Sequence, residues 1–309
     1  MKLAPIALFA YNRPKHLARA IQSLADNEFA KQSILYLFCD GVKKGASPEQ
    51  FAQIAATRSI AQDPALHSKF AEVIIIQQEI NIGLANSIIK GVTQVIQQHG
   101  KIIVLEDDLI TSPYFLSFMN DALNVYENDS KVLSIGACNF FANPPKAVTT
   151  FFLSIPECWG WATWTNRWAL FNADGEALYT ALKAKNLLSS FNLEGAYPFE
   201  RMLQQSIAGK VSSWAIRWYA VSLLNNKINL YPTRSLTNHI AGSGATHASE
   251  NVRPPLATQR IQVLPVPQEV LPTVYRQMRR AYWWRQSIFQ KILLYFQFKI
   301  GYSVFKDND

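Results

Sequence analysis

The fold is decided by residues 102–109, which read IIVLEDDL, a short apolar run that ends in Glu106, Asp107 and Asp108. An apolar run of this length, bounded by polar residues, is typical of a strand that is buried on both faces of a parallel sheet. Adjacent carboxylates repel one another unless a cation compensates them. The stretch therefore predicts a buried strand that brings an acidic triplet to one edge of a sheet.

The rest of the N-terminal half repeats this pattern of strand followed by helix. Further apolar runs lie at residues 3–10, 33–39 and 71–77, and apolar residues recur at helical spacing in 14–25, 48–61 and 81–98. Strands that alternate with helices predict an α/β fold with a mostly parallel sheet and right-handed crossovers. Such sheets bind their ligands beyond the carboxyl ends of the strands, so the residues that follow each run are candidates for a site.

The composition excludes several classes of protein. With 309 residues, 49% of them hydrophobic and 17% charged, the chain is long and apolar enough for a globular core and is neither collagen-like nor wholly disordered. Thirty Lys and Arg against 22 Asp and Glu give a formal charge of +8, which favours an anionic partner. Nucleotide phosphates and lipid headgroups fit this charge; nucleic acid is not expected, because no motif that reads RNA or DNA is present.

Cysteine usage and hydropathy limit the environment. The chain has three cysteines, Cys39, Cys138 and Cys158, whose number is odd and whose spacing is not that of a metal site. We therefore expect neither a disulfide framework nor a zinc site, and we expect the protein to work in a reducing compartment. No stretch reaches the 18 or more apolar residues of a spanning helix, so membrane contact is expected to be peripheral. The apolar start of the chain is interpreted as a strand, because Pro5 interrupts it and no cleavage-type segment follows.

The acidic triplet suggests a metal site, with one alternative. On an extended backbone Glu106 and Asp108 point to one side and Asp107 to the other, so two carboxylates can share a ligand or its metal. Mg²⁺ or Mn²⁺ accepts one or two carboxylates and completes its shell with phosphate oxygens and water. The alternative to a metal site is a structural role, in which the carboxylates stabilise the N-terminus of a nearby helix that begins at Ser112-Pro113. The position at a carboxyl strand end favours function.

Four short motifs in this order resemble a GT-A glycosyltransferase. They are FAYNRP at 9–14, DG at 40–41, NIGL at 81–84 and EDD at 106–108. The triplet is similar to the variant of the DxD motif in the N-acetylglucosaminyltransferases that act on protein glycans. Over residues 3–246 the chain resembles bacterial family-2-like sugar transferases.

The resemblance implies a GT-A-like fold and a metal-dependent glycosyltransferase of the hexosyl or N-acetylhexosaminyl type. Such an enzyme moves a sugar, with inversion, from a nucleotide-diphosphate donor to a glycan or lipid-linked acceptor in bacterial surface polysaccharide or lipopolysaccharide synthesis. It works at the cytoplasmic face of the membrane. The implied organisation is a nucleotide-sugar-binding half at 1–137, an acceptor-binding half at 138–264 of the same domain, and a basic, aromatic, helical tail at 265–309.

The resemblance also implies residue roles on the donor side. Asp108 and His247 are the expected ligands of Mn²⁺ or Mg²⁺. The other donor-side candidates are Glu106 and Asp107 at the sugar or ribose, Asn81 in the nucleotide-sugar site, Asp40 at the nucleobase, Tyr11 lining the base pocket, and Arg13 and Lys90 as cations that assist departure of the diphosphate. For Arg13 and Lys90 a solvated helix face is the alternative, and for Tyr11 plain packing.

On the acceptor side the assignment is less complete. Glu157, Trp159 and Trp161 are the expected acceptor contacts, since aromatic faces suit pyranose rings, with a structural core cluster as the alternative. Relatives often carry a carboxylate as general base where this chain has Ser212. Glu200 is the first substitute for that base and Glu194 the second, and the alternative for Glu200 is an ordinary helix position.

The tail favours a membrane partner. Residues 275–305 contain six Lys and Arg and no acid, and their spacing predicts a helix with an aromatic face and a basic one. Such a helix suits an anionic membrane surface, and the alternative is a helix packed on the domain. Two other functions stay open: a non-catalytic glycan-binding or membrane-associated scaffold, and a sugar-phosphate nucleotidyltransferase, although the Gly-rich loop of the latter is missing after the first strand.

Overall fold

A computed structural model describes residues 2–141, 143–144, 148–240, 254–284 and 286. The first half contains β1 (Ile6–Ala10), α1 (Pro14–Ala25), η1 (Ala30–Gln32), β2 (Ile34–Cys39), α2 (Pro48–Ala61), α3 (Pro64–His67), β3 (Glu72–Gln77), α4 (Leu84–His99), β4 (Lys101–Glu106), β5 (Leu109–Thr111), α5 (Phe115–Val125) and β6 (Val132–Gly136). The second contains β7 (Thr150–Leu153), β8 (Trp161–Trp164), α6 (Thr165–Trp168), α7 (Gly175–Ala184), α8 (Leu188–Phe191), α9 (Phe199–Ile207), α10 (Ala215–Leu224), β9 (Ile228–Pro232), β10 (Thr237–His239) and α11 (Pro272–Trp284).

The helix starts follow local signals. Pro14 and Pro48 stand at first helical positions, where their missing N–H costs nothing. Ser47 and Gln50 form a reciprocal capping box at the start of α2. The observed bounds of α1 and α2 equal the predicted ones, and the four N-terminal strands lie within one to three residues of the predicted runs.

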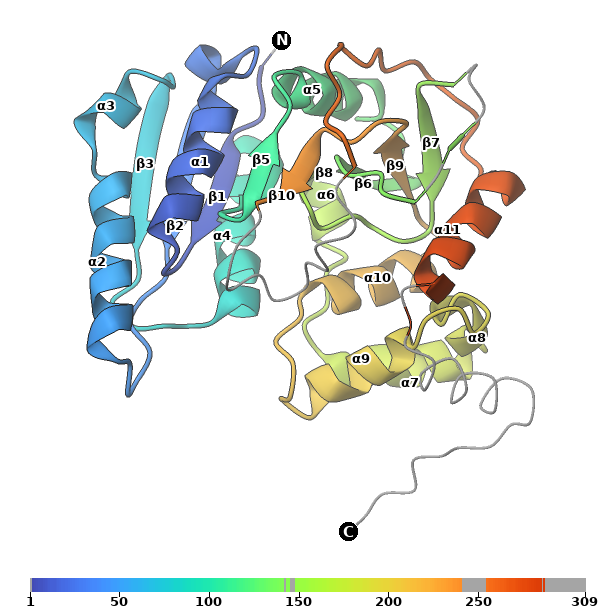
Figure 1. Ribbon diagram of the computed structural model, residues 1–309. Coiled ribbons are helices and arrows are strands. Elements are labelled where there is room, and N and C mark those ends of the chain that lie inside the picture. The colour runs from blue at the N-terminus through green and yellow to red at the C-terminus, as the bar shows by residue number, and fades with distance from the viewer. Residues whose placement is uncertain (1, 142, 145–147, 241–253, 285, 287–309) are drawn as a thin grey trace.

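An eight-stranded, mostly parallel sheet organises the molecule (Figure 1). Its order is β3-β2-β1-β4-β8-β6-β9-β7, and the first four strands run parallel to one another. Strands β8 and β7 run antiparallel to their neighbours. The predicted α/β fold class, a mostly parallel sheet flanked by helices, is therefore confirmed, and this sheet fits a GT-A-like fold. The sheet continues from β4 through β6 to β9, so it crosses the predicted boundary at residue 137; the bounds of the two halves stay predictions.

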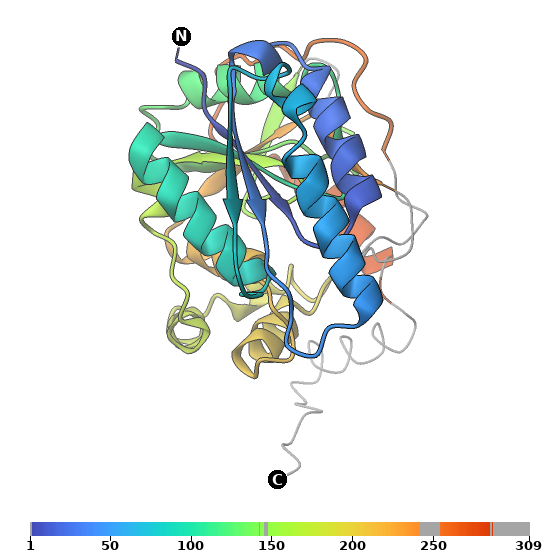
Figure 2. The ribbon, with the colours of Figure 1, turned by 90° about the vertical axis from the view of Figure 1, so that its left-hand side faces the viewer.

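Each face of the sheet has its own hydrophobic core, because successive strand residues point to opposite sides. Ile6 and Leu8 of β1 pack with α1 and α5, whereas Ala7 and Phe9 pack with α4. Figure 2 shows α1 and α2 on one face of the sheet and α4 on the other. Helices α7, α9 and α10 extend the second core below the sheet.

The strand order reverses between β1 and β4. From β1 the chain proceeds outward to β2 and β3, and it then returns through α4 to place β4 on the other side of β1. In doubly wound sheets this reversal separates the loops at the carboxyl ends of the strands and opens a crevice for ligands. The residues that border it are Tyr11 to Arg13, which follow β1, and the acidic triplet, which begins at the last residue of β4.

Helix α11 contains the described part of the predicted tail helix. Val274 and Met278 are fully buried against the core that contains α9 and α10. This part of the tail therefore packs on the domain, while residues 287–309 lie outside the described part. None of the helices in the described part of the chain combines the length and hydropathy that a membrane span requires.

Candidate functional site

The acidic triplet forms a turn at the end of β4. Glu106 is the last residue of the strand, and Asp107 and Asp108 lead directly into β5. Strand β10 pairs antiparallel with β5, opposing His239 to Leu109, and the Ile240 N–H donates to the Asp108 carbonyl at 2.7 Å. The turn is thus held between the main sheet and a two-stranded ribbon.

Arg13 bridges the two aspartates of this turn. One guanidinium nitrogen is paired with the Asp107 carboxylate, and the other lies 3.1 Å from Asp108 Oδ2. The Tyr11 N–H also donates to Asp107, at 3.4 Å. The expectation that Asp107 and Asp108 face opposite sides is wrong, because the strand ends at Glu106 and the turn brings both carboxylates to one cation. Arg13 is therefore a member of the site and not part of a solvated helix face.

One arginine does not compensate the negative charge of the triplet. Burial, followed by repulsion from Asp108 and Asp107, raises the pKa of Glu106 to about 8. Burial also raises the pKa of Asp107 to about 6, although Arg13 opposes that shift. The Glu106 carboxylate makes no hydrogen bond to the described residues. Such a site favours the binding of a further cation.

The donor set fits a cation shared with phosphate oxygens better than one enclosed by protein. Within the described ranges, no three His, Cys, Asp or Glu side chains converge to hold a metal. Mg²⁺ and Mn²⁺ take one or two protein carboxylates when phosphates complete the shell, and Glu106 and Asp108 would be the carboxylates available for that here. His239 Nδ1 lies 3.7 Å from Asp108 Oδ2. His247, the predicted imidazole ligand, lies outside the described residues.

Asp40 fixes the loop that precedes α4. Its carboxylate accepts hydrogen bonds from the Asn81 side chain at 2.8 Å and from the N–H groups of Ile82 at 3.0 Å and Gly83 at 3.1 Å. It also accepts from the Gly41 N–H. Asp40 and Asn81 thus act together, at the carboxyl ends of β2 and β3, and contact of Asp40 with a nucleobase stays a prediction.

This loop leads to a stability prediction at Gly41. An alanine Cβ there would lie 2.2 Å from the carbonyl carbon of Ile80, so the loop must shift. Gly41→Ala should lower the free energy of unfolding by about 1–3 kcal/mol, measured by urea unfolding. Gly45→Ala is the control, since its Cβ meets nothing within 4 Å and only its φ of +78° is strained, at about 1 kcal/mol. A smaller loss at position 41 than at position 45 would contradict the close approach.

Tyr11 lies between the ends of β1 and β2. The Lys43 ammonium stands 5.4 Å from the centre of the Tyr11 ring. Burial, aided by the charge of Asp40, raises the pKa of the Tyr11 hydroxyl, whose oxygen is buried and has no hydrogen-bond partner among the described residues. The ring is half-buried beside the Asp40 loop. Its role in a base pocket stays a prediction.

The aromatic segment separates into a half-exposed part and a buried part. The Trp159 ring stands edge-on to His239 with centroids 4.1 Å apart, next to the acidic turn. Glu157 is buried, and its carboxylate accepts the N–H groups of Cys158 and Trp159, so it shapes this segment. Trp161 is 1% exposed and packs among other tryptophans, which leaves no ring face for an acceptor sugar. Sugar contact by Trp161 therefore lacks structural support, whereas Trp159 remains a candidate.

Three predicted residues are not brought to the triplet. Lys90 is exposed in the second turn of α4, without a hydrogen bond or ion pair to the described part of the chain. The Glu200 carboxylate accepts from Tyr179 Oη at 2.9 Å and from Asn192 Nδ2 at 3.0 Å, and it joins α7, α8 and α9. Glu194 pairs with Arg279 of α11. Their catalytic roles stay predictions.

His16 is a residue that the sequence analysis missed. Its Nε2 atom is buried and has no hydrogen-bond partner among the described residues. Burial and the charge of Arg13 lower its pKa, and Asp108 opposes that shift. The sequence does contain a signal for it. His16 lies three residues after Arg13, and residues three apart on a helix are neighbours, so a site that includes Arg13 is expected to have His16 nearby.

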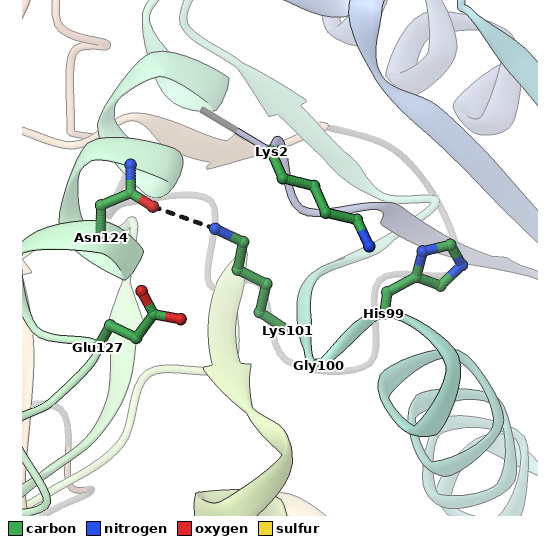
Figure 3. Close-up of a pocket in the computed structure, with 6 residues that line it drawn as sticks. All are labelled: Lys2, His99, Gly100, Lys101, Asn124 and Glu127. Carbon is green, nitrogen blue, oxygen red and sulfur yellow. Dashed lines mark hydrogen bonds between the residues drawn. The ribbon is translucent and has the colours of Figure 1, made fainter.

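A cavity of about 480 Å³ lies away from this site, at the amino end of β4 (Figure 3). It is lined by Lys2, His99, Lys101, Asn124 and Glu127, and Lys101 Nζ donates to Asn124 Oδ1 at 3.1 Å. Because it lies at the opposite end of the strand from the acidic triplet, it does not form part of the candidate site.

Comparisons with known proteins give a partial structural similarity. No protein-family model matches the chain, and no curated protein matches it. Among solved structures, the crystal structure of S. aureus TarS is similar over 47% of this chain and 24% of its own, with 16% identity and a TM-score of 0.29. The structure of S. aureus TarS 1-349 is similar over 43% of this chain and 34% of its own, with 14% identity and a TM-score of 0.27. The matches thus span less than half of either TarS chain, and function has to be argued from the site itself.

Proposed function

We propose that the chain is a glycosyltransferase that moves a hexose or N-acetylhexosamine from a nucleotide-diphosphate sugar to a glycan or lipid-linked saccharide. The observation that supports it is the Arg13-bridged acidic turn at the crevice between β1 and β4. A nucleotide diphosphate fits this crevice, because it supplies phosphate oxygens to a cation on the carboxylates. The resemblance of the motifs to GT-A enzymes supports the same reaction.

The proposed roles follow from position. Asp108 and Glu106 would hold Mn²⁺ or Mg²⁺, with His247 as the expected imidazole ligand. When bound, the cation offsets the charge that develops on the departing diphosphate. Arg13 orients Asp108 and adds a positive charge to the same edge. Asp40 and Asn81 hold the loop beside which the nucleoside would lie.

The acceptor would approach from the side of Trp159, whose half-exposed ring adjoins the acidic turn through His239. The proposed setting is bacterial surface polysaccharide synthesis at the cytoplasmic face of the membrane, with inversion at the transferred sugar. Glu200, in the first turn of α9, remains the proposed general base, and its carboxylate is the group to substitute in a test.

A thermal-shift series tests the proposal. UDP, GDP, CDP and dTDP are each added with and without Mn²⁺ to the parent, to Asp108→Asn and to the exposed control Glu176→Gln. One nucleotide should stabilise the parent and the control in a metal-dependent way, by about 2.7 kcal/mol at 100 times its dissociation constant. Asp108→Asn should lose that response.

The other outcomes separate the alternatives. If no nucleotide stabilises the parent in either condition, the transferase proposal fails and a glycan-binding scaffold takes its place, which the serine at position 212 would then explain. Release of pyrophosphate from a nucleoside triphosphate and a sugar phosphate would instead identify a nucleotidyltransferase.

A further inference from the structure

A second candidate site lies between α11 and residues 193–196, the loop that follows α8. A cavity of about 710 Å³ is lined there by Arg276, Arg279, Arg280 and Trp283 from the helix and by Glu194 from the loop. None of these side chains belongs to the acidic turn. The cavity therefore needs its own explanation.

The walls of this groove are fixed. Val274 and Met278 anchor α11 in the core. Arg279 donates to the Leu193 carbonyl at 3.0 Å and to the Glu194 carbonyl at 3.3 Å, and it is paired with the Glu194 carboxylate. Leu193 and Glu194 have φ values of 49° and 52°, which cost free energy in side chains other than glycine. Arg279 thus stabilises a strained loop that forms the opposite wall.

The groove carries an excess of positive charge. Glu194 is its acidic residue and is already paired with Arg279. Arg276 and Arg280 lie one helical turn apart, and neither makes a hydrogen bond or ion pair to the described residues. The helix itself contains no acid. Two guanidinium groups that converge on one cavity match the oxygens of a phosphate group.

One tryptophan lines the groove, and a second follows it at the end of α11. Trp283 lines the cavity, and Trp284, at the end of α11, is 74% exposed. An exposed tryptophan beside basic residues is costly in water but favourable at the headgroup level of a membrane. Arginines near such a surface are attracted to anionic lipids. Charge and exposed aromatic surface therefore point to the same partner.

We propose that this groove binds the phosphate group of a membrane lipid. Lipid binding at this groove does not depend on the proposed transferase function. Only the identification of the bound lipid as the sugar acceptor rests on that function. Tyr282 of α11 contacts Phe140, with ring centroids 6.3 Å apart, and Phe140 contacts Trp159 at 5.1 Å. Tyr282 does not line the groove, but it lies on the same helix and begins a row of aromatic side chains that leads toward the acidic turn, the direction in which a lipid-linked acceptor would have to extend.

Vesicle sedimentation tests the groove. The parent chain of 309 residues is mixed with phosphatidylcholine vesicles that contain phosphatidylglycerol, with vesicles that contain a polyprenyl diphosphate at equal charge, and with phosphatidylcholine alone. The parent should bind either phosphate-rich vesicle more tightly than phosphatidylcholine. Arg276→Gln/Arg280→Gln should weaken that binding about tenfold or more, whereas the control Arg19→Gln/Lys31→Gln, which removes two exposed charges from α1 and η1, should change it less than about threefold.

The arms have distinct meanings. Preference for the polyprenyl diphosphate identifies the lipid phosphate as that of the acceptor, and equal binding identifies bulk anionic lipid; both support the groove. Equal loss of vesicle binding in the two double variants overturns the proposal, because general positive charge would then explain the binding. Unchanged vesicle binding in Arg276→Gln/Arg280→Gln also overturns it, because another part of the chain would then hold the membrane. Arg276→Lys/Arg280→Lys keeps the charge but not the planar guanidinium groups, so it should bind more tightly than the glutamine variant and more weakly than the parent; binding as weak as that of the glutamine variant would overturn the charge argument. The thermal shift with nucleotides should be unchanged in the groove variant, so failure here is distinct from failure of the proposed transferase.

Discussion

Arg13→Ala should lower the free energy of unfolding at pH 8 by about 3 kcal/mol, because it leaves two nearly buried carboxylates without their counter-ion. The side chains of Asp107 and Asp108 are 2% and 11% exposed, so water compensates them little. We take the low end of the range for broken buried ion pairs, since the Arg13 side chain is itself 22% exposed. Urea unfolding of parent and variant at pH 8 measures the loss.

The loss should depend on pH with a defined sign. The pKa of Asp107 is already raised to about 6 with Arg13 present, and removal of Arg13, which lowers it, should raise it further. Acidification to pH 5 then protonates Asp107 in the variant and removes most of its uncompensated charge. The difference between parent and variant should therefore be smaller at pH 5 than at pH 8.

Two further variants identify the cause of this loss. Arg13→Lys keeps one positive charge but cannot span two carboxylates, so its loss should be intermediate. Asp107→Asn added to Arg13→Ala should recover part of the stability, as a double-mutant cycle for a direct pair requires. An Arg13→Ala loss of equal size at pH 5 and pH 8 would instead assign it to packing or to the start of α1.

The N-terminal half of the fold was predictable because its signals are local. Pro14 and Pro48 mark helix starts, and apolar runs bounded by polar residues mark the buried strands. The second half was not predicted in detail, because its strands pair out of sequence order: β8 inserts between β4 and β6, and β9 between β6 and β7. Neighbours so distant in the chain leave no periodic signal.

The site was predictable in its residue types but not in its geometry. Carboxylates after β4 and Arg13 after β1 follow from the rule that ligands bind at the carboxyl ends of strands. Arg13 can join Asp107 to Asp108 only because β4 ends at Glu106. A strand one residue longer would turn the two carboxylates toward opposite sides. Trp161 and Trp159 are two positions apart in one motif, yet burial assigns one to the core and leaves the other half-exposed. Sequence alone does not show which.

Glu106→Gln should make the protein more stable above neutral pH. The pKa of Glu106 is about 8 in the folded protein against an ordinary value of 4.5, so the folded state prefers the protonated acid. The resulting penalty is absent below about pH 4.5, grows as pH rises and is complete above about pH 8. The neutral amide has no such penalty, so the variant should be roughly 2–4 kcal/mol more stable than the parent at pH 8 and nearly equal to it at pH 4.5.

Urea unfolding across this pH range, with the exposed variant Glu176→Gln as control, measures the effect. A stabilising substitution at the centre of a site indicates a residue kept for function at the expense of stability. If that function is to hold a cation, Mn²⁺ with the responding nucleotide should stabilise the parent more at pH 8 than at pH 5.5, since protonation competes with the metal, and Glu106→Gln should weaken the response. A parent whose stability is flat from pH 5 to pH 8 would show that Glu106 is compensated by the protein alone and would remove the electrostatic argument for a cation at this turn.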